Sequence, residues 1–253
     1  MKAGEKNVLV TGAAKRLGRA IALELAGCGW SIALHHKKSH DEAEETAKAI
    51  REKGVRAIVL AADLGNEDET EPLVAKAANG LGSLSALVNN ASVFEHDTIN
   101  TMSRESWETH MAVNLRAPVL LAQKFAEQLP TGEHGSIVNL LDQRVFKPTP
   151  EFLSYSVTKA GLHWLTTTLA QGLAPHIRVN AVAPGPTLPS ARQSKEQFER
   201  QASSTPLGIG ACPEEIAKAV CYLIEARAIT GQTITLDGGQ HLAWRSADAI
   251  GTE

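Results

Sequence analysis

Tyr155 and Lys159 stand four residues apart, a spacing that suits proton transfer. On an α-helix this spacing places the phenol and the ammonium on one face, within electrostatic reach of each other. A nearby cation favours the phenolate, so we expect the pKa of Tyr155 to fall below its reference value of about 10. Tyr155 is therefore a candidate general acid or base. Such a pair is also common on plain helix surfaces, so the hypothesis depends on the rest of the chain.

The elements that would position this pair follow an alternating pattern. Short aliphatic runs predict strands at residues 7–11, 31–35, 57–61, 86–89, 136–140, 178–183 and 233–236. Longer amphipathic segments predict helices at residues 17–27, 39–53, 67–81, 103–128, 154–174 and 213–226. Several strands lack polar alternation, which is typical of strands covered on both faces. We predict an α/β fold with a doubly wound, parallel, seven-stranded sheet of the Rossmann type and helices on both faces.

The chain is expected to form one domain over residues 1–253, because no linker or repeat divides it. One segment departs from the alternation. Residues 184–208 concentrate prolines and glycines around a polar stretch, which predicts a long loop with a short helix. Placed after a strand, such a segment is expected to act as a substrate lid.

Composition excludes several classes of protein. The net charge of −3 gives no electrostatic footprint for nucleic acid or an anionic membrane, and the apolar runs are of strand length. The three cysteines have no metal-ligand spacing, so no metal site is expected. The first residues lack the charged-then-apolar pattern of a secretory leader, and we expect a cytoplasmic protein with reduced thiols.

The first strand runs into a glycine-containing turn and then a helix. Gly12 and Gly18 would let a ligand approach the backbone, and the N-terminus of the helix favours a pyrophosphate. Ordinary strand-to-helix turns also use glycine, so the turn alone is weak evidence for a nucleotide site. Its position at the first strand strengthens that interpretation.

The end of the second strand carries basic residues where an NAD-binding protein usually has an acidic residue. Lys37, Lys38 and Ser39, with Lys15 from the first turn, could hold a 2′-phosphate, which favours NADPH over NADH. The alternative is a solvated basic start of a helix. Asp63 ends the third strand, where it could accept from an adenine amine or cap the helix that follows.

Taken together, these residues resemble the short-chain dehydrogenase/reductase family. The resemblance covers residues 11–239 and extends to several motifs: Thr11-Gly12 with Gly18, Asn89-Asn90-Ala91, Asn114, Tyr155 with Lys159, Pro184-Gly185 and Asp237-Gly238-Gly239. In that family the asparagine supports a proton-relay water, and the Pro-Gly loop meets the nicotinamide carboxamide. The loop around Leu188-Pro189-Ser190 does not reproduce the usual family sequence.

Two departures from the family resemble its pteridine reductase branch. Asp142 lies thirteen residues before Tyr155, where most members have a serine, and Arg16 replaces the third glycine of the turn. The segment Asn90-Ala91-Ser92-Val93-Phe94 also resembles that branch, whose phenylalanine stacks on the pterin ring. Reducing a C=N bond requires protonation of a ring nitrogen, and a buried carboxylic acid suits that task. Each of these residues also has an alternative role. Asp142 could bond a neighbouring backbone group, Phe94 could be a core aromatic, and Arg16 could bind the cofactor only.

The resemblance assigns roles to a full set of residues. The catalytic group is Tyr155, Lys159, Asp142 and Asn114, and the substrate contacts are Arg16, Ser92 and Phe94. The cofactor contacts are Thr11, Gly12, Lys15, Arg16, Leu17, Gly18, His36, Lys37, Lys38, Ser39, Asp63, Leu64, Asn90, Ala91, Pro184 and Gly185.

The leading hypothesis is an NADPH-dependent reductase of a small-molecule pterin-type ring, dihydropterin or dihydrofolate. A carbonyl or ketoacyl reductase that tolerates Asp142 and a non-catalytic NADPH-binding protein remain alternatives. Family members often form homotetramers, and apolar residues such as Leu162, Trp164, Leu165 and Leu169 could pair helices between subunits. His241 and Trp244 could reach a neighbouring site or serve packing alone.

Overall fold

The computed structural model describes residues 6–190 and 192–244. Seven strands form one parallel sheet in the order β3-β2-β1-β4-β5-β6-β7. The strands are β1 (Asn7–Val10), β2 (Ser31–His36), β3 (Ala57–Ala61), β4 (Ala86–Asn89), β5 (Gly135–Leu140), β6 (Ile177–Pro184) and β7 (Thr233–Leu236). The predicted fold class is therefore confirmed, and each strand lies within one residue of its predicted bounds.

Burial explains why these runs form the centre of the sheet. Every residue of β1, β4 and β5 is buried, so both faces of these strands are covered. In the sheet Leu9 pairs with Ala33 on one side and with Leu87 on the other. Side chains from alternate positions enter two separate cores, one on each face.

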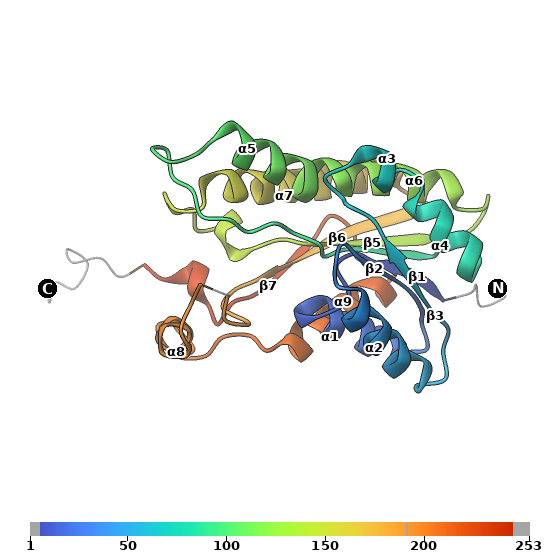
Figure 1. Cartoon of the computed structure of the whole chain (residues 1–253), viewed down its shortest axis with the longest axis horizontal. Helices are drawn as coiled ribbons and strands as arrows, with labels where there is room; N and C mark the ends of the chain where they lie inside the picture. The colour runs from blue at the N-terminus through green and yellow to red at the C-terminus, as the bar shows by residue number, and fades with distance from the viewer. Residues whose placement is uncertain (1–5, 191, 245–253) are drawn as a thin grey trace, which may run out of the picture.

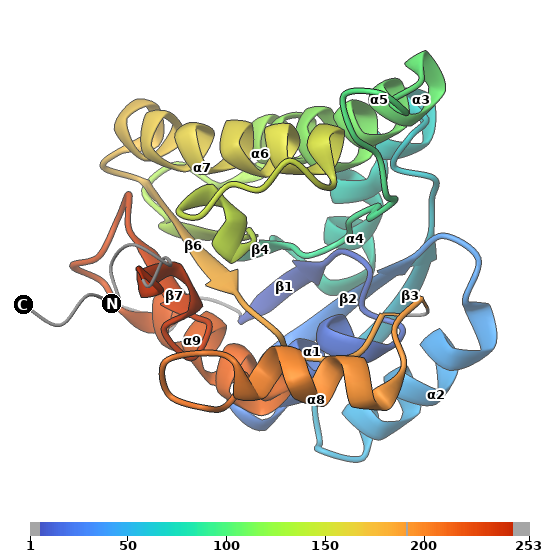
Figure 2. The same ribbon diagram turned by 90° about the vertical axis from the view of Figure 1, so that its left-hand side faces the viewer.

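The helices form the two outer layers (Figures 1 and 2). One layer holds α1, α2 and α9, and the other holds α3 to α7, while α8 lies on the same side as α1. Their bounds are α1 (Arg16–Gly27), α2 (His40–Arg51), α3 (Glu67–Thr70), α4 (Leu73–Leu81), α5 (Arg104–Met111), α6 (Ala117–Gln128), α7 (Leu153–Leu173), α8 (Lys195–Ser203) and α9 (Pro213–Glu225). Three short helical turns complete the set: the π turn η1 (Ala112–Arg116) and the 3₁₀ turns η2 (Gln143–Val145) and η3 (Gln240–Leu242).

Two predicted helices are interrupted. The helix predicted at 67–81 divides into α3 and α4, because Pro72 lacks the N–H that a continuous helix needs. In the helix predicted at 103–128 the chain stays helical, but the π turn η1 interrupts the α-helical pattern between α5 and α6. Such π turns are rare and occur frequently at functional sites.

The topology gathers the carboxyl ends of the strands at one edge of the sheet. The strand order reverses between β1 and β4, and a crevice is expected at such a switch point. Residues 184–208 leave β6 at this edge and include α8, as the sequence predicts. Among the described helices, none is long and apolar enough to cross a membrane.

Candidate active site

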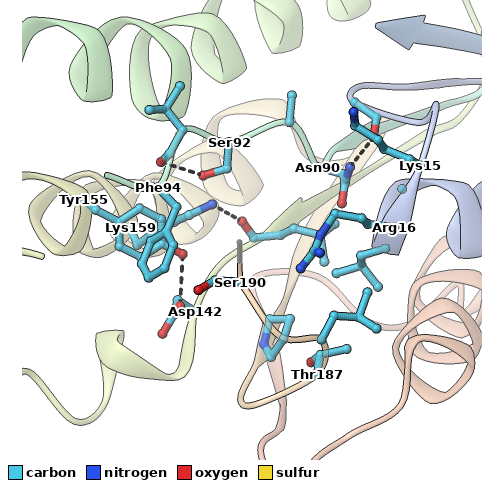
Figure 3. Close-up of a pocket in the computed structure, with 18 of the residues that line it drawn as sticks. Lys15, Arg16, Asn90, Ser92, Phe94, Asp142, Tyr155, Lys159, Thr187 and Ser190 are labelled. Atoms are coloured by element: carbon cyan, nitrogen blue, oxygen red, sulfur yellow. Dashed lines mark hydrogen bonds between the residues drawn. The ribbon is translucent and has the colours of Figure 1, made fainter. Parts of the chain in front are cut away.

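A cleft of about 1140 Å³ opens at the carboxyl edge of the sheet. Figure 3 shows Tyr155, Asp142 and Phe94 at one end of it and Lys15 and Arg16 at the other. The loops after β1, β2, β4, β5 and β6 all contribute to its wall. No cluster of metal-ligating side chains occurs in the described part of the chain.

The turn after β1 leaves no room for a side chain at its two glycines. Gly12 has a φ of +64°, and a Cβ added at Gly18 would lie 2.1 Å from the carbonyl oxygen of Gly12. Thr11 is buried behind the turn, where its hydroxyl accepts hydrogen bonds from the backbone N–H groups of Asn90 and Ala91 at 2.9 and 3.0 Å. Thr11 therefore ties the β1 turn to the loop after β4 and does not itself line the cleft.

His35 fixes the same turn from the next strand, and sequence reasoning did not single it out. Its Nδ1 accepts from the N–H of Gly12 at 3.1 Å, so its Nε2 carries the proton and donates to the carbonyl of Ala62 at 3.0 Å. Burial lowers the pKa of His35 to about 4. The side chain is thus a neutral bridge between three strand ends.

The basic end of the cleft has the composition that the sequence predicts. Lys15, Lys37, Lys38 and Ser39 all line it. Lys37 pairs with Asp63 at 2.7 Å, a contact that lowers the pKa of that carboxyl, and Lys15 approaches Glu42 at 3.5 Å.

Near these lysines, within the described chain, one side chain lacks hydrogen-bond partners and one helix N-terminus lacks a compensating negative charge. His36 is buried, and neither of its ring nitrogens has a hydrogen-bond partner among the described residues. Helix α1 starts without a side-chain cap and without an acid in its first turn, so its N-terminal partial positive charge is uncompensated. Both features suit an anionic ligand at this end of the cleft.

Arg16 has an unusual backbone. Its φ is +54°, in the left-handed region where a non-glycine residue is uncommon, and its guanidinium donates to the carbonyl of Pro189 at 2.9 Å. Such strain persists where the surroundings determine it, often at functional sites. The side chain reaches from the β1 turn to the segment after β6.

The central chemical pair lies on α7 as predicted. Tyr155 and Lys159 are both buried, and the hydroxyl of Tyr155 donates to Asp142 Oδ2 at 3.0 Å. Lys159 directs its ammonium to the carbonyl of Leu140, 2.7 Å from its Nζ, and burial lowers its pKa to about 8. Figure 3 shows both contacts.

The expectation of a lowered tyrosine pKa is wrong for this arrangement. Burial, followed by the charge of Asp142, raises the pKa of Tyr155 well above its usual value. The ammonium of Lys159 lies 5.6 Å from the centre of the tyrosine ring and is bonded elsewhere, so it does not offset these effects. Tyr155 is held as a protonated donor.

Asp142 has a second partner that sequence reasoning missed. The guanidinium of Arg144 donates to Oδ2 and Oδ1 at 3.1 and 3.3 Å, and the backbone N–H of Arg144 donates to Oδ1 at 2.9 Å. Both side chains are mostly buried. The carboxylate is therefore fixed between a guanidinium and the Tyr155 hydroxyl.

Asn114 lies in η1, behind the cleft wall. Its side-chain amide bonds to both the N–H and the carbonyl of Val93, at 2.8 and 2.9 Å, and also contacts Ser92 and Thr158. Protein groups thus use its donors and its acceptor. The side chain positions the loop that carries Ser92, and a role in a water relay stays a prediction.

An aromatic pair flanks the catalytic residues. Phe94 stacks on Phe152 with ring centres 4.3 Å apart, and it meets the edge of Tyr155 at 4.6 Å. Phe152 is the N-cap of α7 and has a φ of +58°, a strained backbone for a bulky residue. The guanidinium of Arg144 lies over both phenylalanine rings. Phe152 and Arg144 complete the site, although neither carries a periodic signal in the sequence.

The remaining predicted residues also have clear positions. Leu17, Leu64, Asn90, Ala91, Ser92, Pro184 and Gly185 line the cleft. His241 does not, since both its N–H and its ring contact Asp237 Oδ2 at 2.8 Å. Trp244 is exposed.

Comparisons with known proteins agree with this geometry. A protein family described as enoyl-(acyl carrier protein) reductase matches residues 12–241. The short-chain dehydrogenase/reductase eriH of Hericium erinaceus is 34% identical, with 92% of this chain and 96% of that protein covered. The chain belongs to the short-chain dehydrogenase/reductase family.

Two further similar proteins in this family carry different enzyme names. The 3-oxoacyl-[acyl-carrier-protein] reductase FabG of Staphylococcus aureus is 34% identical and covers 94% of this chain and 98% of its own. The crystal structure of FolM alternative dihydrofolate reductase 1 from Brucella suis, in complex with NADP, is 47% identical with a TM-score of 0.94. That match covers 98% of this chain and 99% of the FolM chain.

Proposed function

We propose that this protein is an NADPH-dependent reductase of a pterin-type ring, a dihydropterin or dihydrofolate. The observation that carries the proposal is the hydrogen bond from Tyr155 to Asp142 beside Phe94, in a cleft with a basic far end. A carboxylate in this position suits protonation of a ring nitrogen better than reduction of a simple ketone. The similarity to FolM supports the same reaction class.

The residues at the basic end fit NADPH. The glycine turn gives close backbone access, and the uncapped start of α1 favours a pyrophosphate. Lys38 and Ser39, with the unpartnered ring of His36, suit a 2′-phosphate. When bound, NADPH supplies a hydride.

The chain's own groups supply the proton. The raised pKa of Tyr155 keeps its phenol protonated, so this hydroxyl is the immediate proton donor. Asp142 accepts the phenol hydrogen bond and so orients the hydroxyl of Tyr155, whose proton passes to the ring nitrogen. Lys159 would contact the nicotinamide ribose, and Arg16 would bridge the cofactor phosphates and the polar edge of the substrate. Phe94 and Ser92 would hold the flat ring.

A panel of substrates tests the proposal. NADPH oxidation is measured with dihydrobiopterin, dihydromonapterin and dihydrofolate beside ketones and acetoacetyl thioesters. Tyr155→Phe should abolish turnover while NADPH still binds, because only the proton donor is removed. Unchanged turnover by this variant would refute the assignment.

The similarity to FabG favours a ketoacyl reductase as the second candidate. Asp142→Ser separates the two functions. A pterin reductase should lose turnover severely, whereas a ketoacyl reductase should keep or gain activity, since serine is the usual residue of the family at this position. Turnover of thioesters alone would overturn the pterin proposal.

We also propose a cytoplasmic homotetramer. Trp164 on α7 is 73% exposed, as a helix that pairs between subunits would require. Leu162, however, is buried in the subunit's own core, so its predicted place in an interface is wrong. Size-exclusion chromatography with light scattering tests the assembly, and a monomer would refute it.

A further inference from the structure

Two glutamines of the cleft wall have side-chain oxygens without a hydrogen-bond donor in the described part of the chain. Gln143 follows Asp142 in η2, lines the cleft and is only 5% exposed. Gln240 lines the cleft from η3. The Oε1 atoms of both are buried and have no hydrogen-bond partner among the described residues.

The two glutamines belong to one wall. Elements η2 and η3 pack against each other, and the ammonium of Lys147 donates to the backbone carbonyl of Gln240 at 3.2 Å. The backbone N–H of Gln240 is itself bonded, to the carbonyl of Asp237 at 3.0 Å. The backbone near Gln240 is thus fixed, while the side-chain oxygens of both glutamines lack donors.

A buried acceptor without a donor is unfavourable, so these oxygens favour a ligand that can donate. One donor on the same wall is also unsatisfied, because Nε of Arg144 is buried without a partner. A hydroxyl group donates and accepts, and it therefore matches both kinds of atom. A methyl group matches neither.

We propose that Gln143 and Gln240 form a specificity subsite for hydroxyl groups on the substituent of the ring that is reduced. The subsite rests on the proposed function, since Gln143 adjoins Asp142, where that ring would react. The glutamines act in substrate selection, and Tyr155 and Asp142 retain the proton transfer.

The test combines changes in the protein with changes in the substrate. Gln143→Met and Gln240→Met keep the approximate side-chain length but remove the amide. Gln232→Met is the matched control, because Gln232 lies outside the cleft. Each protein is assayed with dihydromonapterin, which carries hydroxyls, with 6-methyl-dihydropterin, which carries none, and with dihydrofolate, which offers an N–H.

Each cleft variant should lose roughly three- to tenfold in kcat/KM for dihydromonapterin, as expected for one neutral hydrogen bond. The loss should fall on KM, and turnover of 6-methyl-dihydropterin should stay unchanged. Calorimetric titration of the NADP⁺-loaded proteins with monapterin should show the same loss of affinity, with NADP⁺ affinity unaltered.

Other outcomes overturn the subsite in different ways. Equal losses with all three substrates would place the contact on the ring itself, and a loss with dihydrofolate alone would assign it to an N–H. No loss with any substrate would leave the glutamines without a role in recognition. Failure of the wild-type protein to reduce every pterin would instead refute the proposed function.

Discussion

Lys159 allows a quantitative prediction about the conflict between stability and function. Burial lowers its pKa from 10.5 to about 8, and a shift of this size corresponds to about 3 kcal/mol. The native protein carries this cost at neutral pH, where the ammonium is charged in both the native and the unfolded state. Lys159→Met removes the charge but also the hydrogen bond to Leu140. We expect a net gain of about 2 kcal/mol in the free energy of unfolding near neutral pH, together with loss of activity.

The pH dependence isolates this effect. Above pH 8 native Lys159 gives up its proton, while the unfolded chain keeps it until about pH 10.5, so wild-type stability rises with pH through this window. The advantage of Lys159→Met should therefore shrink by about 2 kcal/mol between about pH 7 and about pH 9.5. Thiols and other groups that titrate in both proteins contribute equally to the two stabilities, so their contributions cancel in the difference.

Urea unfolding of the cofactor-free proteins, followed by circular dichroism at both pH values, measures the difference. Cofactor must be absent because a ligand of the native state adds its own stabilisation. A stability difference that stays constant with pH would refute the reasoning. So would a methionine variant that is less stable than wild type near neutral pH.

Three further predictions follow from the same geometry. Gly18→Ala should weaken NADPH binding at least about tenfold in a fluorescence titration, because its Cβ would lie 2.1 Å from the carbonyl oxygen of Gly12; an unchanged Kd would contradict this. The stability that neutral His35 contributes should be fully present above about pH 6.5 and should fall by about 2 kcal/mol between about pH 7 and about pH 5. In denaturant titrations His35→Gln should lack this pH-dependent loss, and parallel pH profiles of the two proteins would count against the prediction. Burial raises the pKa of Cys221 to about 12, so a thiol reagent near pH 8 should label exposed Cys212 first; equal rates by mass spectrometry would oppose this assignment.

The strands could be predicted because their signal is local. A parallel sheet covered on both faces requires uninterrupted aliphatic runs, and β4 is such a run between polar residues. The split of the predicted helix 67–81 was also visible in principle, since Pro72 breaks the backbone ladder. The π turn carries no comparable mark, because it reflects how two helix faces fit their surroundings.

Spacing along the chain predicts a contact within the site only where the two residues share an element. Tyr155 and Lys159 lie on one helix, so their spacing predicts their common face. The Lys159 ammonium donates to a backbone carbonyl at the end of β5, a partner that no spacing on α7 reveals. His35 is a similar case, because its partners Gly12 and Ala62 come from separate strand ends. The unexpected direction of the tyrosine pKa shift likewise has tertiary causes, first the burial of Tyr155 and then the charge of Asp142.

The π turn also limits how this helix can change by mutation. His110 before it and Asn114 within it both hold the loop after β4, through the N–H groups of Glu95 and Val93. Beyond it, Leu121 and Phe125 are buried in the core. The π turn holds one residue more than an α-helical turn, so deleting one residue from 112–116 would restore the α-helical ladder and leave the two flanking segments in phase. Deleting one residue from α5 or α6 would instead rotate one side against the other by about 100°. Either the loop contacts or the core contacts would then be lost, so this helix tolerates a one-residue change in length only at the π turn.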